Sequence, residues 1–292
     1  MPLWLATQAS GKKTAMDVVQ VPVLFNRPET PSVHRLGVAY DACSRGVRAA
    51  QFVMLALPDM EAHIIPRPFS VSDAWREGAG REVTEFLYKP VGRVTGRMRR
   101  LEPGDDLRIG GVQGNGFPDP ARGRRPVLMA GGIGNAPFAY HVRSLIAAGH
   151  KPEEITLFLA GRSKDDIWIQ GQVRESGIEI VEITDDGSRG RKGLITDVFS
   201  ERLPDLGEVE VFACGPLPML RAIQSLALGQ DFPCHLSLEE HMACGYGVCN
   251  ACVVESAEAG LPRGENPYIR LCIEGPVCEA RTVHLAEELG AK

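Results

Sequence analysis

Cys244-Gly-Tyr-Gly-Val-Cys249-Asn-Ala-Cys252 is the stretch around which this chain is organised, and Cys272 completes its pattern. Three cysteines at this spacing, with a distant fourth, are typical of plant-type [2Fe–2S] ligands. The two glycines between the first cysteines suit a loop around a cluster, because they tolerate positive φ and leave backbone N–H groups accessible. A structural zinc site and a set of buried free thiols are the alternatives. Zinc usually needs a second cysteine pair or histidines, and nothing of that shape follows here.

The composition of the 292-residue chain indicates a globular protein with two domains and a small third one. Hydrophobic residues make up 44% and charged residues 24%, which is ordinary for a soluble protein. The net charge of −5 is mild, so neither nucleic acid nor an anionic membrane is an expected partner. No window approaches the length of a membrane span. Eight cysteines without a secretory signal predict a reducing, cytoplasmic compartment.

The rhythm of apolar residues divides the chain into three parts. From Val18 to about Gly116, short β-branched runs alternate with Pro, Gly and Asp, which predicts a small antiparallel barrel. The basic, proline-rich stretch 118–125 predicts an interdomain linker. Strand and helix patterns then alternate as far as Leu228, which predicts a doubly wound parallel sheet. We expect domains at 1–120, 121–230 and 231–292, the last being a tail that carries the cysteines.

Arg67-Pro68-Phe69-Ser70 is the first candidate binding motif, at a place where one barrel strand is expected to end. An arginine and a hydroxyl on either side of a fixed proline can hold phosphate oxygens. Gly92-Arg93-Val94-Thr95 lies 25 residues further on and can add backbone N–H groups for a pyrophosphate. The alternative interpretation of the first motif is a simple turn.

A glycine turn between an apolar strand and a helix is the second candidate site. The stretch 128–137 contains Gly131, Gly132 and Gly134, which let the backbone approach a dinucleotide. The helix that follows offers partial positive charge to the phosphates. Such turns are common, and this one is not the G-x-G-x-x-G fingerprint.

Cys214-Gly215-Pro216 repeats the strand–turn–helix logic one unit later. This position places Cys214 at the carboxyl edge of the sheet, where ligands of doubly wound folds bind. Cys43, Cys234 and Cys278 lie outside the ligand pattern, and we expect them to be packing thiols.

In their order along the chain, these motifs resemble the electron-transfer subunits of NAD-linked dihydroorotate dehydrogenases, within the ferredoxin–NADP reductase superfamily. The resemblance covers about residues 18–285. Its most specific parts are Thr184-Asp185-Asp186-Gly187-Ser188 and the Cys-Ile-Glu-Gly-Pro-Val run that begins at Cys272. The chain departs from the family at Val94, at Gly110–Phe117, and in a longer gap before Cys272, where residues 257–267 form an expected inserted loop.

The resemblance implies a barrel that binds FAD, a sheet domain that binds NAD(H), and a tail that carries the cluster. Carried over by position, the FAD residues are Arg67, Pro68, Phe69, Ser70, Leu87, Tyr88, Lys89, Val94 and Thr95. The dinucleotide candidates are Gly131, Gly132, Gly134, Asp185, Gly215 and Pro216, with Cys214 as the catalytic candidate. The cluster ligands are Cys244, Cys249, Cys252 and Cys272.

The expected function is electron transfer from NADH through FAD and the [2Fe–2S] cluster to an acceptor beyond this chain. A cluster that takes one electron at a time makes sense only with such an acceptor. By resemblance the acceptor is the FMN of a partner dihydroorotate dehydrogenase in a hetero-oligomer that serves pyrimidine biosynthesis. A diaphorase subunit that feeds ferredoxin or another oxidoreductase is one alternative, and a non-enzymatic redox-sensing module is another.

Asp185 favours NADH over NADPH as the electron donor. A carboxylate suits the free ribose hydroxyls of NAD and repels a 2′-phosphate. In NADP-using reductases of the superfamily, a Ser-Arg pair stands at this place. Four basic residues oppose the prediction if any of them points toward the ribose, although solvated loop charges are the alternative. They are Arg162, Arg189, Arg191 and Lys192.

Overall fold

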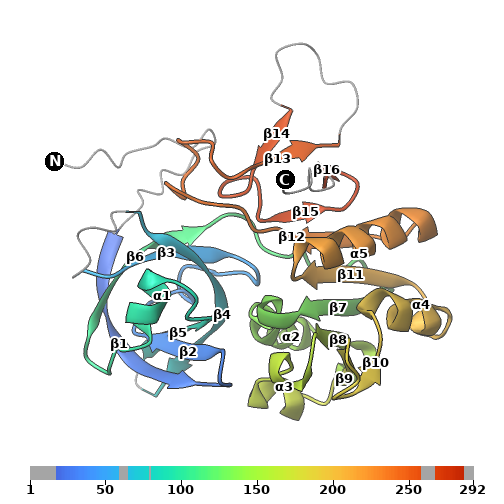
Figure 1. Cartoon of the computed structure of the whole chain (residues 1–292), viewed down its shortest axis with the longest axis horizontal. Coiled ribbons are helices and arrows are strands. Elements are labelled where there is room, and N and C mark those ends of the chain that lie inside the picture. Colours follow the sequence, from blue (N-terminus) through green and yellow to red (C-terminus); the bar gives the residue numbers. More distant parts are fainter. Residues whose placement is uncertain (1–17, 59–64, 79, 258–266, 286–292) are drawn as a thin grey trace.

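The computed structural model describes residues 18–58, 65–78, 80–257 and 267–285, which form a barrel, a large sheet and a small tail (Figure 1). The barrel closes in the strand order β1-β2-β5-β4-β3-β6, with antiparallel pairing throughout. Its elements are β1 (Val18–Pro28), β2 (His34–Val38), β3 (Phe52–Ala56), β4 (Arg67–Glu77), β5 (Arg81–Tyr88), α1 (Arg93–Met98) and β6 (Asp106–Gln113). The antiparallel barrel expected from the sequence is confirmed.

One detail of the barrel differs from the sequence interpretation. Arg67-Pro68-Phe69-Ser70 does not end a strand but begins β4, which is 11 residues long. Prolines are normally kept to the first residues or edges of strands, and Pro68 is the second residue here. The strand was missed because its first residues look like a turn, while its pairing with β3 and β5 supplies the register.

The second part is a sheet in the order β10-β9-β8-β7-β11-β12-β15, parallel except at β15. Its strands are β7 (Arg125–Gly131), β8 (Thr156–Gly161), β9 (Glu179–Thr184), β10 (Arg191–Lys192), β11 (Val209–Cys214), β12 (Cys234–Ser237) and β15 (Val277–Glu279). Its helices are α2 (Phe138–Ala147), α3 (Gly171–Glu175), α4 (Ile195–Leu206) and α5 (Leu217–Gln230), with short 3₁₀ turns at η1 (Gly132–Asn135), η2 (Pro152–Glu154) and η3 (Lys164–Asp166).

The sheet is covered on both faces because side chains alternate along each strand. Val127 and Met129 of β7 share a core with α4 and α5, whereas Leu128 and Ala130 share one with α2 and α3. All four side chains are fully buried. The doubly wound arrangement predicted from the strand–helix rhythm is therefore confirmed, and the carboxyl ends of its parallel strands face the barrel (Figure 1).

The tail contributes to two sheets. β13 (Val253–Ser256), β14 (Tyr268–Arg270) and β16 (Val283–His284) form a small sheet of their own in the order β14-β13-β16. β12 and β15 also come from the segment after residue 230, and both are built into the large sheet. Most of the inserted loop expected at 257–267 lies outside the described residues. Among the helices that the structure describes, none is long and apolar enough to cross a membrane.

The barrel and the large sheet meet through buried polar groups. Gln170 donates to Ser72 at 2.8 Å and to Glu85 at 3.0 Å, across the joint between the two parts. Arg143 of α2 forms an ion pair with Asp73 of β4 at 2.5 Å. Burial raises the pKa of Glu85 to about 7, against the lowering effect of Arg35. The joint is therefore a specific polar contact and fixes how the barrel faces the carboxyl edge of the sheet.

Candidate functional site

The four cysteines of the predicted ligand pattern lie on two neighbouring loops of the tail. Val253 of β13 pairs with Arg270 of β14, and the N–H of Leu271 donates to the carbonyl of Cys252 at 2.9 Å. This hairpin brings Cys272 beside Cys252, although a long stretch of sequence separates them. Both side chains are buried. Cys244 is half-buried and Cys249 is exposed.

The four thiols come together as two pairs. Cys249 is within hydrogen-bonding reach of Cys244, and Cys252 is within reach of Cys272. Across the part of the chain that the structure describes, no three His, Cys, Asp or Glu side chains are grouped around a single metal position. The two irons of a [2Fe–2S] cluster share four cysteines, and two cysteine pairs fit that donor set.

The loop around Cys244 favours a thiolate. Burial raises the pKa of the Cys244 thiol, but hydrogen bonds from the backbone N–H groups of Tyr246, Cys249 and Val248 and from the Cys249 side chain outweigh this effect and lower the pKa to about 7. Among them, the N–H of Tyr246 lies 3.5 Å from the Cys244 sulfur. Gly245 makes this turn possible at φ +79°, since an added β-carbon would lie 2.6 Å from Met54 of the barrel. The loop thus presents N–H groups to sulfur, as the sequence predicted.

Asn115 ties the barrel to the segment that follows Cys272. Its side-chain amide donates to the carbonyls of Glu274 at 2.9 Å and Val277 at 2.8 Å, and it accepts from the Val277 N–H at 2.9 Å. Its backbone N–H also donates to the carbonyl of Gly275 at 2.6 Å. Asn115 lies in the Gly110–Phe117 stretch where the sequence departs from the family pattern. The departure therefore coincides with a contact that holds the loop of the fourth cysteine.

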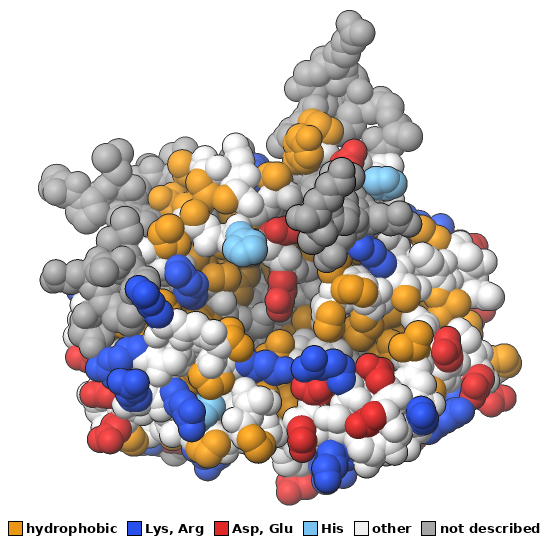
Figure 2. All heavy atoms as spheres, viewed as in Figure 1, with side chains coloured by type: hydrophobic (Ala, Val, Ile, Leu, Met, Phe, Trp, Pro, Cys, Tyr) orange, Lys and Arg blue, Asp and Glu red, His pale blue; other side chains and the backbone are white. Residues whose placement is uncertain are grey.

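A cavity of about 1070 Å³ runs along the carboxyl edge of the large sheet. Figure 2 shows it as the hollow between barrel, sheet and tail, with acidic side chains inside it. All three parts of the chain contribute to its wall. The predicted residues that line it are Lys89, Gly131, Gly132, Gly134, Asp185, Gly215 and Pro216. The lining residues that the sequence interpretation missed include Thr196, Arg221, Leu238, Glu239, Glu240, Val253, Val254, Glu255, His284 and Leu285.

The cavity is suited to a dinucleotide by its backbone and by an unpaired cation. A β-carbon on Gly134 would lie 2.4 Å from the carbonyl oxygen of Cys214, so only glycine lets these two loops meet at the edge of the sheet. Arg221, in the first turns of α5, has a buried Nε that lacks a hydrogen-bond partner among the described residues. A buried guanidinium nitrogen without an acceptor is costly unless a ligand supplies one. A phosphate oxygen is such an acceptor.

Cys214 lies where the sequence placed it, at the carboxyl end of β11, opposite Ser237 of β12. Its side chain is only 3% exposed and packs in the core on the α2 side of the sheet. Burial, with the Glu239 carboxylate nearby, raises the pKa of this thiol to about 12. A neutral buried thiol can shape the end of the cleft but is not a nucleophile. Its catalytic role stays a prediction.

Asp185 lines the cavity, whereas most of the four basic residues that oppose the NADH prediction do not. Asp185 is exposed and lines the cavity. Arg189 pairs with Glu182 at 2.6 Å and Arg191 pairs with Glu201 at 2.5 Å, so both guanidinium groups are already neutralised. Arg162 lines the cavity, while Lys192 is exposed at the sheet edge and does not line it. Arg162 is the basic group of the four that stays near Asp185.

The candidate flavin residues converge on the barrel surface. Antiparallel pairing of Val71 with Phe86 sets the start of β4 beside the end of β5, and the rings of Phe69 and Tyr88 meet edge to face at 6.3 Å. Arg67 donates to the carbonyl of Ile65 at 2.7 Å and, among the described residues, forms no ion pair, so its charge is available to a phosphate.

The remaining candidate flavin residues divide between the surface and the core. Thr95 accepts the N–H groups of Val91 and Gly92 at 3.0 Å, and Val94 packs on the barrel core. The predicted residues of β4, β5 and α1 thus border one region, with Leu87 and Tyr88 buried beneath it.

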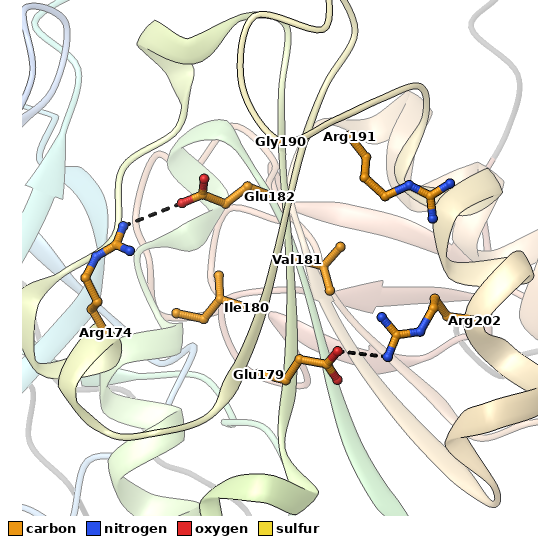
Figure 3. Close-up of a pocket in the computed structure, with 8 residues that line it drawn as sticks. All are labelled: Arg174, Glu179, Ile180, Val181, Glu182, Gly190, Arg191 and Arg202. Atoms are coloured by element: carbon orange, nitrogen blue, oxygen red, sulfur yellow. Dashed lines mark hydrogen bonds and ion pairs between the residues drawn. The ribbon is translucent and has the colours of Figure 1, made fainter.

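A second depression, of about 520 Å³, lies at the outer edge of the large sheet (Figure 3). Its arginines are occupied by carboxylates: Arg174 contacts Glu182 at 3.5 Å and Arg202 contacts Glu179 at 2.8 Å. None of the predicted site residues lines it. Its third arginine, Arg191, is paired with Glu201 outside the depression. Each arginine therefore already has a carboxylate partner, and the cavity at the carboxyl edge is the stronger candidate site.

Comparisons with known proteins match two parts of the chain to family models. Residues 128–225 match the model described as oxidoreductase NAD-binding domain. Residues 239–284 match the iron-sulfur cluster binding domain of dihydroorotate dehydrogenase B. The two matches cover the loops of the cavity and all four cysteines of the ligand pattern.

Two curated relatives carry the name dihydroorotate dehydrogenase B (NAD(+)), electron transfer subunit. That of Caldanaerobacter subterraneus is 34% identical over 262 residues, which are 89% of this chain and 96% of the relative. That of a Geobacillus species is 32% identical over 268 residues, or 91% and 98% of the two chains.

Solved structures share the fold at lower identity. An NADH-dependent reduced ferredoxin-NADP oxidoreductase structure matches with a TM-score of 0.76 at 23% identity, over 91% of this chain and 90% of that one. The ferredoxin reductase in carbazole 1,9a-dioxygenase matches with a TM-score of 0.61 at 24% identity, over 75% and 68%.

Proposed function

This chain belongs to the family of dihydroorotate dehydrogenase B electron transfer subunits, and we propose that it carries electrons from NADH through FAD and a [2Fe–2S] cluster to a partner subunit. One observation carries the proposal: a single cavity is lined by the barrel, the glycine loops of the sheet and the tail. Lys89, Gly134 and Val253 represent the three parts on its wall. A donor in this cavity lies between the flavin region and the cluster loop.

Each part of the chain has a separate task in this function. Arg67 and the N-terminal turn of α1 hold the FAD phosphates, Gly131–Gly134 and Arg221 hold the dinucleotide, and the four tail cysteines hold the cluster. The flavin supplies the step from two-electron to one-electron chemistry, which no side chain provides. The protein contributes binding, orientation and the exclusion of water. We propose a cytoplasmic location, because thiols that bind a cluster need reducing surroundings.

The cluster loop offers an exit for electrons toward a partner. Cys249 is exposed and Val248 has 62% of its surface exposed, so the tip of the loop presents a thiol and an apolar side chain to the outside. We infer that this tip of the loop faces the partner, a catalytic subunit that binds FMN and interconverts dihydroorotate and its oxidised product, in a hetero-oligomer. A buried neighbour such as Cys272 cannot serve as the contact.

The direct test of the function is reconstitution with the partner. The purified chain should show flavin and [2Fe–2S] absorption, NADH should bleach both, and re-oxidation should be fast only when the FMN subunit is added. Zinc without labile sulfide in the purified chain would contradict the cluster assignment. Bleaching of the flavin alone would leave a diaphorase without a route to the partner.

Arg67→Ala tests the flavin site separately. Loss of a charge-assisted contact to phosphate is worth roughly 1.5–3 kcal/mol, so flavin affinity should fall about tenfold to a hundredfold. The dissociation constant of FAD, measured by fluorescence on deflavinated protein, reports this. Arg76→Ala is the matched control, because Arg76 lies on the same strand as Arg67 but is already paired with Glu82 of β5 at 2.9 Å. Equal affinities in wild type and Arg67→Ala would mean that Arg67 is only a surface residue.

The choice of NADH over NADPH rests on Asp185. We propose a preference for NADH of at least about tenfold, near 1.4 kcal/mol, because Arg189 and Arg191 are held by glutamates away from the ribose. Stopped-flow flavin reduction with both donors measures the ratio, and Asp185→Ser should narrow it. Preference of the wild type for NADPH would show that Arg162 dominates the site.

A further inference from the structure

Glu239 is a carboxylate in the cleft that lacks a counter-charge. It lies just beyond the carboxyl end of β12 and lines the cavity beside Gly215 and Pro216. Within residues 18–58, 65–78, 80–257 and 267–285 it has no hydrogen bond and no ion pair. Glu239 is exposed and lines the cavity wall, and partial burial there raises the pKa of its carboxyl group. Such a group is stabilised by a cation or a donor that enters the cavity.

The order of the strands indicates which end of a bound dinucleotide lies beside Glu239. Asp185 follows β9 and Glu239 follows β12, and the strands between them are β8, β7 and β11. Four strand spacings of about 4.8 Å separate the two carboxylates by roughly 19 Å along the cleft. With the adenosine ribose at Asp185, as proposed above, the nicotinamide lies over β11 and β12. The field of Glu239 already reaches the Cys214 thiol at the end of β11.

The charge of the nicotinamide changes during the reaction. The C–H bond at the reduced ring breaks, the hydride carries both electrons to N5 of the flavin, and the remaining ring bears one positive charge. Charge balances because the reduced flavin is left anionic. A fixed anion beside the ring attracts the oxidised form and has little effect on the neutral reduced form.

We propose that the Glu239 carboxylate contacts the nicotinamide end of the bound dinucleotide and selectively stabilises its oxidised, positively charged form. The inference rests on the proposed function, since it needs NAD(H) in this cleft. It makes Glu239 a substrate-binding residue that favours departure of the hydride from NADH. Contact with the adenine end instead would stabilise both redox forms equally.

The test compares two ligands that differ in ring charge. NAD⁺ and tetrahydro-NAD, whose reduced ring is neutral and donates no hydride, are titrated by calorimetry into oxidised holoprotein. Glu239→Gln should weaken NAD⁺ about tenfold and tetrahydro-NAD by less than about twofold. Glu239→Asp should recover part of the NAD⁺ affinity. Flavin and cluster absorption of each variant confirms that the fold is retained.

Two control variants keep the result specific. Glu208→Gln removes a carboxylate whose side chain is 78% exposed, paired with Arg124 at the opposite end of β11, and should change neither ligand. Glu240→Gln removes the neighbouring carboxylate on the same wall, and a larger effect there than at Glu239 would overturn the assignment.

The possible failures are distinguishable. Equal weakening of both ligands in Glu239→Gln, or no change in either, would overturn this inference alone. A wild-type holoprotein that binds neither ligand would overturn the proposed function as well.

Discussion

Seven of the eight cysteines of this chain fall into two sets: four stand on loops of the tail and three stand on strands of the large sheet, while Cys43 lies in a turn of the barrel. Cys244 and Cys249 lie on a loop whose N–H groups lower the pKa of Cys244 to about 7. Cys214 and Cys278 lie on strands of the large sheet, where burial raises the pKa of each thiol to about 12. The loop therefore favours the thiolate at Cys244, whereas the strands keep Cys214 and Cys278 as neutral packing groups.

Backbone conformation separates the two sets better than burial does. Cys272 is fully buried, as the strand cysteines are, and its pKa is also raised to about 12. It is nevertheless paired with Cys252, because the β13–β14 hairpin brings the two together. A strand uses its N–H groups in ladders, whereas a loop can direct them at sulfur.

Cys249→Ser should give the largest effect and tests the first set. Removal of one thiolate of the loop should abolish the cluster, so that iron, labile sulfide and the [2Fe–2S] absorption disappear together. Flavin should stay bound, because its candidate residues all lie in the barrel. Loss of both groups would mean that the tail is needed to fold the barrel.

Asn115→Ala tests whether tertiary contacts hold the loop of the fourth cysteine, Cys272. Three side-chain hydrogen bonds are lost, at about 1 kcal/mol each, so the loop should be destabilised by about 2–3 kcal/mol. The cluster should bleach at a lower temperature than in the wild type, monitored by its visible absorption.

The matched control for that loop is Asn26→Ala. It also removes three hydrogen bonds, to Met98, Leu101 and Tyr88, but on the barrel surface. It should leave the bleaching temperature of the cluster unchanged. Equal bleaching temperatures in the two variants would show that the hydrogen bonds of Asn115 have no local role at the cluster.

Cys214→Ala against Cys234→Ala separates position from burial within the second set. Both thiols are buried strand residues, but Cys214 ends β11 at the cleft whereas Cys234 begins β12 at the far edge. Flavin reduction by NADH should slow about tenfold, near 1.4 kcal/mol, only in Cys214→Ala. Stopped-flow rates measure the difference. Equal rates in the two variants would remove Cys214 from the list of functional residues.

Cys278→Ser should give the smallest effect. A hydroxyl in place of this buried thiol costs about 1–2 kcal/mol, which lowers the melting temperature by roughly 2–8 °C. Iron and labile sulfide should be unchanged, because Cys278 pairs with Leu236 in the sheet ladder and lies outside the ligand pattern. A variant without its cluster would show that the fourth ligand is Cys278 instead of Cys272.

Local patterns in the sequence predicted much of the fold. The strand–helix rhythm predicted β7, β8, β9 and β11 because each is a short apolar run followed by a turn or helix signal. β4 was assigned wrongly because Pro68 near its start resembles a turn, and only pairing with two other strands makes it regular. β12 and β15 were not anticipated, since four and three residues are too few to show a period.

The residues of the candidate site also divide into those that local sequence patterns predict and those that they do not. Gly134 and the ligand cysteines could be predicted because a turn or a chelating loop is a short-range requirement. Arg221 and Glu239 could not, because a charged residue after a strand or on a helix usually faces solvent. Their significance comes from the cavity that three parts of the chain enclose.

Short-range spacing defines which chemistry is available: the spacing of Cys244, Cys249 and Cys252 and the glycine turn at Gly131–Gly134 act over a few residues, where covalent geometry limits the choices. Where these groups meet depends on tertiary packing. Asn115 reaches Val277 across 162 positions of sequence, and the pairing of β12 with β11 brings Glu239 to the end of Cys214's strand. Contacts of this range depend on how barrel, sheet and tail pack, and no local spacing encodes them.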